Sequence, residues 1–393
     1  MLFMKRHLLS ILLAGLFPLT ALPQGKLPPS GPPGPTMKTL DQLDAKLEKR
    51  IPISSIPFDI SKPGSYYLTQ NLSGAAPGIT AKVSGVTIDL NGFAITGPGK
   101  GLPSTGSGVV GLDDTVVRNG RISDFGDDGV HLGGACVLEN LDIVNIGGAC
   151  INVGEQARVR NCRVGAGAKG IVVGLSSIID SCTSIGNTGA TPAAGIVMGS
   201  FGTVSNSISS YNAGDGISVA NGDGVTNCVV ANNTGGGIVA ATGSKVSECA
   251  SRSNKGTGIS LGSGSTVKRC TVTDSGSDGI RAVNGCVILE NNVVGNVLIA
   301  NSAGIHLTGT DSGAANRLES NEVSLANPGI QVESGGNFIV KNIVAGGFTI
   351  SSPYRIANGN TLRVVLAPTS GPFDGKTGGS GLGSTDPWAN FTN

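Results

Sequence analysis

The chain has 393 residues, of which 63 are glycine; 13% are charged, 4% are aromatic, and the formal net charge is +1. Glycine at this level disfavours long helices. A nearly neutral chain without a basic stripe also lacks the positive face with which nucleic-acid-binding proteins neutralise phosphates. We therefore expect a large, helix-poor protein with no nucleic-acid partner.

Residues 1–21 have the three parts of a secretory signal peptide. A positive start at Lys5–His7 is followed by an apolar run from Leu8 to Leu19 and by the small residues Thr20 and Ala21. The run is short for a transmembrane helix, although an uncleaved anchor is the alternative because the ideal small-x-small cleavage pattern is absent. No later apolar stretch is long enough to span a bilayer. We expect a secreted, periplasmic or cell-surface protein with no membrane span after signal removal, and the sequence leaves its oligomeric state open.

Residues 22–36 are rich in proline and glycine, which is typical of an extended linker. Apolar residues at helical spacing, with charges between them, predict one short amphipathic helix over residues 37–50. After this helix, alternating apolar and polar residues around Gly and Asn-Gly turns predict strands.

A glycine that precedes an apolar residue recurs at a fixed interval through the middle of the chain. Several successive examples have the same spacing, and a few other steps are slightly shorter or longer. A fixed period with insertions confined to particular positions indicates a solenoid, in which each repeat packs on its neighbours. The evenly spaced glycines are Gly195, Gly216, Gly237, Gly258 and Gly279.

Each repeat contains two or three brief Val/Ile runs and shows no helical periodicity. About 21 residues, at roughly 3.3 Å per strand residue, make one coil of a three-sided stack. The sequence therefore predicts an all-β protein, a parallel β-helix of about eleven rungs with a short N-terminal helix and capping segments. The predicted organisation is a signal peptide at 1–21, a linker at 22–36, an N-terminal helix and strand cap at 37–107, the β-helix at 108–345, and a C-terminal cap and tail at 346–393.

Three columns of residues follow from this register. The first and third positions after each glycine are expected to point inward, as at Ile217 and Val219. Twelve residues after the glycine lies a column of mostly cysteine, and seventeen after it a column of mostly asparagine. Asparagine suits a corner because it tolerates left-handed conformations and passes side-chain hydrogen bonds along a column. The two columns are Cys162, Cys182, Ser207, Cys228, Cys249 and Cys270, and Asn187, Asn212, Asn233, Asn254, Ser275 and Asn296.

Eight cysteines in an exported chain would ordinarily suggest four disulfides. Stacked cysteines, however, point the same way at the strand spacing of about 4.8 Å, whereas the Cβ atoms of a disulfide lie nearer to about 3.8 Å apart. We therefore expect mostly free, buried thiols. A metal column is the alternative, although thiolate sites favour close C-x-x-C spacing.

The phrases "NAGDGI", "NTGGGI" and "NKGTGI", together with the cysteine and asparagine columns, resemble the right-handed parallel β-helix superfamily of pectate lyases, polygalacturonases and NosD-like surface proteins. The resemblance covers roughly residues 108–344 and implies the right-handed form of the fold. The flanking "GSYYLTQNL", "TIDLNGFAITG" and "TDPWANF" are similar to exported bacterial β-helix proteins of unassigned activity. That second resemblance implies fold and export, and nothing about chemistry.

Two clusters are candidate catalytic sites. The stretch "GDDGVH" offers Asp127, Asp128 and His131. Polygalacturonases use clustered aspartates, one as general acid and one to activate water, with a histidine and an arginine. The match is partial, because the Asn-Thr-Asp, Gly-His-Gly and Arg-Ile-Lys signatures of that family are absent. The pectate lyase pattern Arg-x-Pro-x-x-Arg is absent as well.

The second cluster comes from "DSGSDGIRA" and the "GIHL" of the following rung, which stack Arg281 beside His306 near Asp274 and Asp278. A lyase could use the arginine as base and aspartates to hold Ca²⁺, although an arginine needs special help to lose its proton. The two clusters are seven rungs, or roughly 34 Å, apart, so at most one is an active centre. In the alternative interpretation the aspartates are turn residues, and His131 and Arg281 merely face solvent.

The sequence favours an exported scaffold, adhesin or polysaccharide-contacting module without a cofactor. Aromatic residues are few between Gly108 and Val344, and the two histidines left after signal removal do not supply a multidentate metal site. The other hypothesis is a divergent glycoside hydrolase or polysaccharide lyase that uses one of the two clusters, with Ca²⁺ only in the case of a lyase.

Overall fold

The computed structural model describes the β-helix and parts of its C-terminal segment. Residues 50–393 form one compact unit. The predicted signal peptide, the linker and all of the predicted N-terminal helix except Arg50 lie outside the described residues. The described residues are 50–74, 77–101, 106–189, 194–296, 302–309, 315–345, 353–363, 365–366 and 387–392.

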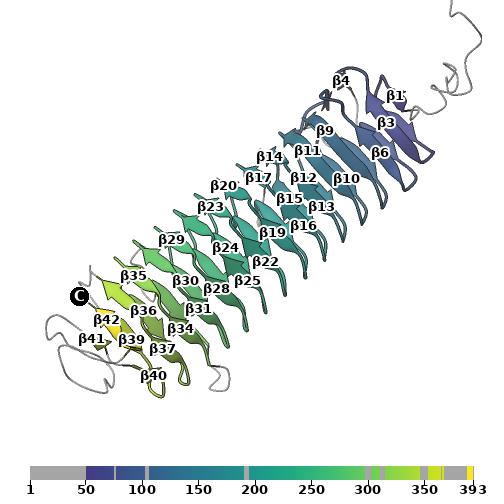
Figure 1. Cartoon of the computed structure of the whole chain (residues 1–393). Coiled ribbons are helices and arrows are strands. Elements are labelled where there is room, and N and C mark those ends of the chain that lie inside the picture. Colours follow the sequence, from purple (N-terminus) through teal and green to yellow (C-terminus); the bar gives the residue numbers. More distant parts are fainter. Residues whose placement is uncertain are drawn as a thin grey trace, which may run out of the picture. The chain divides into compact units, whose positions relative to one another are not determined.

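Short parallel strands stack as successive coils in this unit, and no helix occurs among its described residues (Figure 1). Each coil contributes one strand to a 14-stranded sheet, here sheet 1, and further strands to a 28-stranded sheet, here sheet 2. The pairings are parallel, as expected when each coil repeats the path of the preceding one. The predicted all-β parallel solenoid is therefore confirmed.

Sheet 1 extends beyond the eleven rungs that the glycine spacing indicated. Its first strands precede Gly108, and Ile79 pairs with Val109 although more than one repeat period of chain separates them. Inserted turn residues conceal the period there. The strands of sheet 1 are β2 (Phe58–Ile60), β5 (Ile79–Ala81), β8 (Val109–Gly111), β10 (Val130–Leu132), β12 (Ala149–Val153), β15 (Lys169–Val173), β18 (Ile196–Met198), β21 (Ile217–Val219), β24 (Ile238–Ala240), β27 (Ile259–Leu261), β30 (Ile280–Ala282), β33 (Ile305–Leu307), β36 (Ile330–Val332) and β39 (Tyr354–Ile356).

Sheet 2 consists of two adjacent columns of strands, which the long strands β9 (Val116–Ser123) and β11 (Val137–Val144) join. The first column contains β1 (Ile51–Ile53), β3 (Gly64–Leu68), β6 (Val86–Asp89), β13 (Arg158–Arg160), β16 (Ile178–Asp180), β19 (Thr203–Ser205), β22 (Gly224–Thr226), β25 (Lys245–Ser247), β28 (Thr266–Lys268), β31 (Val287–Leu289), β34 (Arg317–Glu319), β37 (Phe338–Val340) and β40 (Thr361–Leu362). The second contains β4 (Leu72–Ser73), β7 (Ala94–Thr96), β14 (Arg163–Gly165), β17 (Thr183–Ile185), β20 (Ile208–Ser210), β23 (Val229–Ala231), β26 (Ala250–Arg252), β29 (Thr271–Thr273), β32 (Asn292–Val294), β35 (Glu322–Ser324), β38 (Ile343–Ala345), β41 (Val365–Leu366) and β42 (Asn390–Thr392).

The core is a set of stacked aliphatic columns, and its register is the predicted one. Ile217 and Val219 are buried, as are their equivalents in the neighbouring coils. Burying a side chain of this size contributes about 1.5–3 kcal/mol relative to leaving it exposed. All eight cysteines are buried and free of disulfides, which confirms the expected free thiols.

The predicted asparagine column is a buried hydrogen-bond ladder. Asn187 donates from Nδ2 to Oδ1 of Asn212 over 2.7 Å, and Asn212 repeats the contact with Asn233 over 2.9 Å. The asparagines of this column do not themselves adopt the left-handed conformation that asparagine tolerates. The left-handed residue lies one position earlier, as at Gly186 and Tyr211, so that the asparagine itself points inward.

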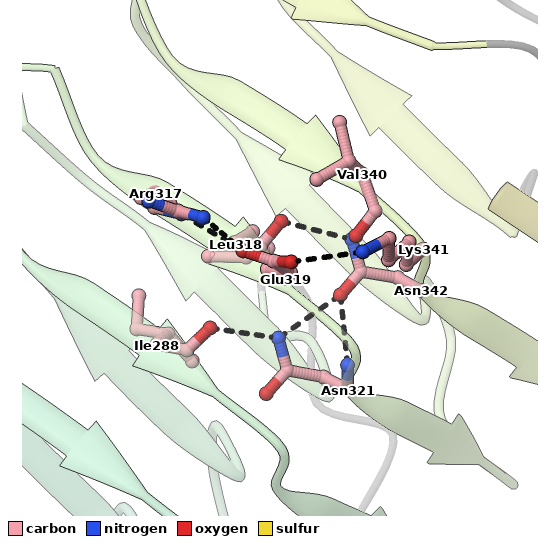
Figure 2. Close-up of polar contacts among 8 residues, drawn as sticks. All are labelled: Ile288, Arg317, Leu318, Glu319, Asn321, Val340, Lys341 and Asn342. Atoms are coloured by element: carbon pink, nitrogen blue, oxygen red, sulfur yellow. Dashed lines mark hydrogen bonds and ion pairs between the residues drawn. The ribbon is translucent and has the colours of Figure 1, made fainter. Parts of the chain in front are cut away.

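A second ladder continues the cysteine column toward the C-terminus. Asn321 donates from Nδ2 to Oδ1 of Asn342 and to the Ile288 carbonyl, both over 2.9 Å (Figure 2). Beside it on the surface, Glu319 accepts from Arg317 and Lys341. Asparagine thus replaces cysteine in this column and adds a bond between coils.

The tail supplies the last rung of this ladder. Strand β42 pairs with β38, and Asn390 accepts from Nδ2 of Asn342 over 3.1 Å. The ring of Trp388 lies 4.1 Å from Nζ of Lys341. Residues 387–392 therefore pack on the β-helix through both backbone and side chains.

Candidate functional site

The residue before the last in each sheet 1 strand stands in one line along the stack, here called the outward column. Its residues are in register because each strand pairs directly with its neighbour. His131, Arg281 and His306 all belong to it. The column comprises Asp59, Thr80, Val110, His131, Asn152, Val172, Val197, Ser218, Val239, Ser260, Arg281, His306, Gln331 and Arg355.

The N-terminal cluster is a carboxylate–histidine pair with an exposed ring. Oδ2 of Asp128 lies 2.8 Å from Nδ1 of His131, and Asn152 donates from Nδ2 to the same oxygen over 2.9 Å. Asp128 is 7% exposed and also accepts the backbone N–H of Ala149 over 2.7 Å. The side chain of His131, by contrast, is 53% exposed. A buried, fully engaged carboxylate thus orients a histidine that faces solvent.

Asp127 does not join this pair. Its Oδ2 accepts from the Ser107 hydroxyl over 3.2 Å, whereas the hydrogen bonds of Asp128 go to other partners. Two carboxylates that flank one bond would be needed for glycoside hydrolysis. The structure therefore brings Asp128 and His131 together and leaves Asp127 in a separate contact.

The geometry fixes which nitrogen of His131 is available. Since Nδ1 faces a carboxylate, it carries the hydrogen, and the lone pair is on Nε2. Among the described residues, Nε2 has no hydrogen-bond partner. An imidazole held in this tautomer can accept a proton or a hydrogen bond from a ligand.

The C-terminal cluster is the reverse case, a buried histidine between two carboxylates. Nδ1 of His306 lies 3.1 Å from Oδ1 of Asp278, and Nε2 lies 2.9 Å from Oε1 of Glu333. His306 is 4% exposed and Asp278 is 3% exposed. Burial alone would lower the pKa of His306, but the hydrogen bonds and negative charges of Asp278 and Glu333 outweigh it and raise that pKa. Both ring nitrogens are engaged, so neither is available to a ligand.

Arg281 stands beside His306 in the outward column but takes no part in this network. It is exposed, and no ion pair of Arg281 occurs among the described residues. Gln331, the next residue in the column, donates from Nε2 to Glu333 over 3.2 Å. The proposed stacking of Arg281 and His306 is present, but the aspartate binds only the histidine.

Three aspartates occupy equivalent positions and share one structural contact. Asp128, Asp215 and Asp278 each accept the backbone N–H of the equivalent residue in the next coil, over 2.6–2.7 Å. This is the turn role that the sequence left open. Only the first and third also bind a histidine, so Asp215 is a natural control for the other two.

The clusters are well separated, as expected. Strands β10 and β30 are seven strands apart in sheet 1, or roughly 34 Å at strand spacing. Within the described part of the chain, no group of three or more His, Cys, Asp or Glu residues is arranged to hold a metal ion.

Sequence reasoning missed Asn152 and Glu333. Asn152 could have been found, because it lies one repeat period after His131 and therefore beside it in the next coil. Glu333 gave no such signal, because it stands outside the outward column and reaches His306 through its side chain. Pairing by the repeat period detects neighbours in one column but not contacts between columns.

Comparisons with known proteins agree with this architecture. A family model described as a right handed beta helix region matches residues 104–251. A double mutant of the periplasmic alginate epimerase AlgG has a TM-score of 0.53 at 11% identity, over 74% of this chain and 77% of the epimerase chain. The A-module of Azotobacter vinelandii mannuronan C-5 epimerase AlgE4 has a TM-score of 0.44 at 16% identity, over 79% of this chain and 88% of the module. No curated protein matches the chain.

The chain is a right-handed parallel β-helix protein, as the resemblance implied. At 11% identity the AlgG structure shows a shared fold and no more. Among the described residues, no helix is long and apolar enough to cross a membrane.

Proposed function

We propose that the chain is an exported β-helix protein that contacts polysaccharide through the outward column, as an extracellular or cell-surface scaffold or adhesin. The observation that carries this proposal is the register of sheet 1, which places one outward side chain per coil at about 4.8 Å intervals. A linear polymer that runs along the column meets an at least partly exposed side chain at each coil as far as Arg281, whereas the next two residues, His306 and Gln331, are buried. The AlgG neighbour, a periplasmic alginate epimerase, has the same fold.

Two exposed aromatic rings support a sugar-binding surface. Phe201 is 72% exposed and Tyr211 is 62% exposed, and they flank strands β19 and β20 of one coil. Exposed aromatic faces provide apolar area on which a sugar ring can stack. Phe125, in contrast, is wholly buried and serves the core.

Binding to immobilised polysaccharides tests the proposal. The secreted chain would be passed through native gels that contain acidic or neutral polysaccharides, and its retardation measured. We expect retardation by at least one polymer and weaker retardation for the double variant His131→Ala/Asn152→Ala. Asp215→Asn, which leaves the outward column intact, is the matched control. Retardation by no polymer of the panel would contradict the proposal.

A second candidate function is cleavage at the Asp128–His131 pair. The favouring observation is that the Nε2 lone pair of His131 faces solvent while Asp128 holds Nδ1. This arrangement suits a general base, as a polysaccharide lyase requires, better than the paired carboxylates of a hydrolase. The C-terminal cluster lacks a free ring nitrogen, so the lyase hypothesis now concerns the N-terminal cluster.

Unsaturated-product absorbance, measured on the same polymers with and without Ca²⁺, tests this second candidate. Cleavage that His131→Gln abolishes and Asp215→Asn preserves would establish it. Binding without cleavage would leave the scaffold function and exclude the lyase for the polymers tested.

A further inference from the structure

A ladder of buried polar side chains runs along the corner that follows sheet 1. At several rungs a side-chain oxygen accepts a backbone N–H from the preceding coil. Ser265 accepts from Ser244 over 3.1 Å, and Asn316 accepts from Cys286 over 2.7 Å. Asp223 occupies the same position, and its Oδ1 accepts the N–H of Gly202 over 2.5 Å. One carboxylate oxygen of Asp223 therefore makes the same contact as the side-chain oxygens of Ser265 and Asn316.

The same side chains also donate a hydrogen bond back to the preceding coil. Ser244 donates to the Ala220 carbonyl and Ser265 to the Ala241 carbonyl, each over 3.0 Å. In both cases the acceptor precedes its donor by the same stretch of chain, slightly more than one coil. By this register, the acceptor opposite Asp223 is the carbonyl of Gly199.

Asp223 can complete the rung only as a neutral acid. The residue is 1% exposed, and its Oδ2 is buried without a hydrogen-bond partner among the described residues. An ionised carboxylate has no hydrogen to donate, and its negative charge would face the carbonyl oxygen and be repelled by it. A protonated carboxyl group has one acceptor and one donor, which is the pattern of a serine hydroxyl or an asparagine amide.

The surroundings supply no charge that would stabilise the ionised form. The polar groups facing Asp223 are backbone groups of Gly202 and Ala220 and, from the next coil, the Ser244 hydroxyl. No charged side chain contributes to the pKa of Asp223. Burial raises the pKa of Asp223, and the backbone hydrogen bonds only partly oppose it.

We infer that Asp223 is protonated in the folded chain and donates from Oδ2 to the Gly199 carbonyl, forming a pH-sensitive joint between the coils of β19 and β22. The proton comes from solvent when the chain folds. Loss of that proton leaves a buried, unpaired charge at this corner, which opens more readily as the pH rises. Phe201 precedes Gly202 in the chain, and its backbone N–H donates to the Asn221 carbonyl near the joint.

Asp223→Asn is the decisive variant, because the chain itself uses asparagine at equivalent rungs. The side chain of Asn316 accepts from Cys286 and donates to the Val283 carbonyl over 2.9 Å, and it does both at every pH. The measurement is the unfolding equilibrium constant of both proteins from pH 4 to pH 8, with hydrogen exchange at the Gly202 amide as a local readout.

The sign of the expected effect follows from linkage. Because the folded pKa is raised, the stabilisation is fully present below the unfolded pKa, 3.8, and declines as the pH rises toward the folded value. In that interval the unfolding constant of the wild type should rise by about tenfold per pH unit relative to Asp223→Asn. Above the folded pKa the difference should become constant, with Asp223→Asn the more stable protein and Gly202 better protected.

Three outcomes would overturn the inference. They are a pH-independent difference between the two proteins, lower stability of Asp223→Asn throughout, and unchanged exchange at Gly202. Asp215→Asn is the control, because Asp215 accepts a backbone N–H at a different, partly exposed corner. Relative to Asp215→Asn, the wild type should not lose stability as the pH rises.

Discussion

Two histidines of the outward column each bind an aspartate at an equivalent position, but they differ in burial and in their other contacts. His131 is exposed and keeps one nitrogen free, whereas His306 is buried and uses both. Each aspartate makes the same backbone contact to the next coil. The difference shows that the fold provides the aspartate and that burial of the histidine decides its role. An exposed, oriented ring is accessible from solvent, while a buried ring between two carboxylates links three coils.

The largest expected effect is the loss of the buried link. His306→Ala leaves Asp278 buried without its positive partner, and breaking a buried ion pair costs about 3–5 kcal/mol. His131→Ala removes an exposed ring, and surface changes of this kind usually stay within about 0.5 kcal/mol. Urea denaturation of the two variants measures this contrast. Equal losses of unfolding free energy in the two variants would contradict the expected contrast.

The second expectation concerns pH. Because the pKa of His306 is raised above its ordinary value of 6.5, its contribution to stability is full below that value and is lost as the pH rises through the folded pKa. The wild type should therefore lose stability between neutral and alkaline pH relative to His306→Gln. Unfolding midpoints across this range, with His131→Gln as control, measure the effect. Parallel curves for all three proteins would contradict it.

A smaller effect is expected when Asp128 is replaced by asparagine, which has the same shape but no charge. Asp128→Asn retains an oxygen for the Ala149 amide, so its unfolding free energy should change by only about 1 kcal/mol. The amide can, however, donate to Nδ1 of His131, which moves the ring hydrogen to Nε2. Nitrogen-15 NMR of the imidazole distinguishes the two tautomers. An unchanged tautomer in Asp128→Asn would show that Asp128 does not orient His131.

The smallest expected effect is that of a substitution at Phe201, which lies between the two clusters along the stack. Phe201 has φ of +65° at a corner where the next coils have Gly222, Gly243 and Gly264. A bulky residue in this region is strained, and glycine relieves the strain at the cost of a more flexible unfolded chain. Phe201→Gly should raise the unfolding free energy by about 0.5–1 kcal/mol and weaken polysaccharide binding. Leu325→Gly, at another left-handed, exposed position, should leave binding unchanged.

The sequence predicted the parts of this protein that repeat. The constant spacing of the glycines was enough to place Ile217 and Val219 inward, to stack the cysteines and to align the asparagines, because coils in register repeat one environment. It did not reveal the coils before Gly108, where the chain between Ile79 and Val109 is longer than one repeat period. It also did not reveal the contact of His306 with Glu333, which comes from another column.

Polysaccharide retardation of His131→Ala and Ser260→Ala tests the central proposal most directly, since both residues belong to the outward column and only the first is held by an aspartate. We expect the wild type to be retarded, His131→Ala to lose most of the retardation, and Ser260→Ala to lose little. Retardation that persists undiminished in His131→Ala would contradict the proposal that this ring contacts the polymer.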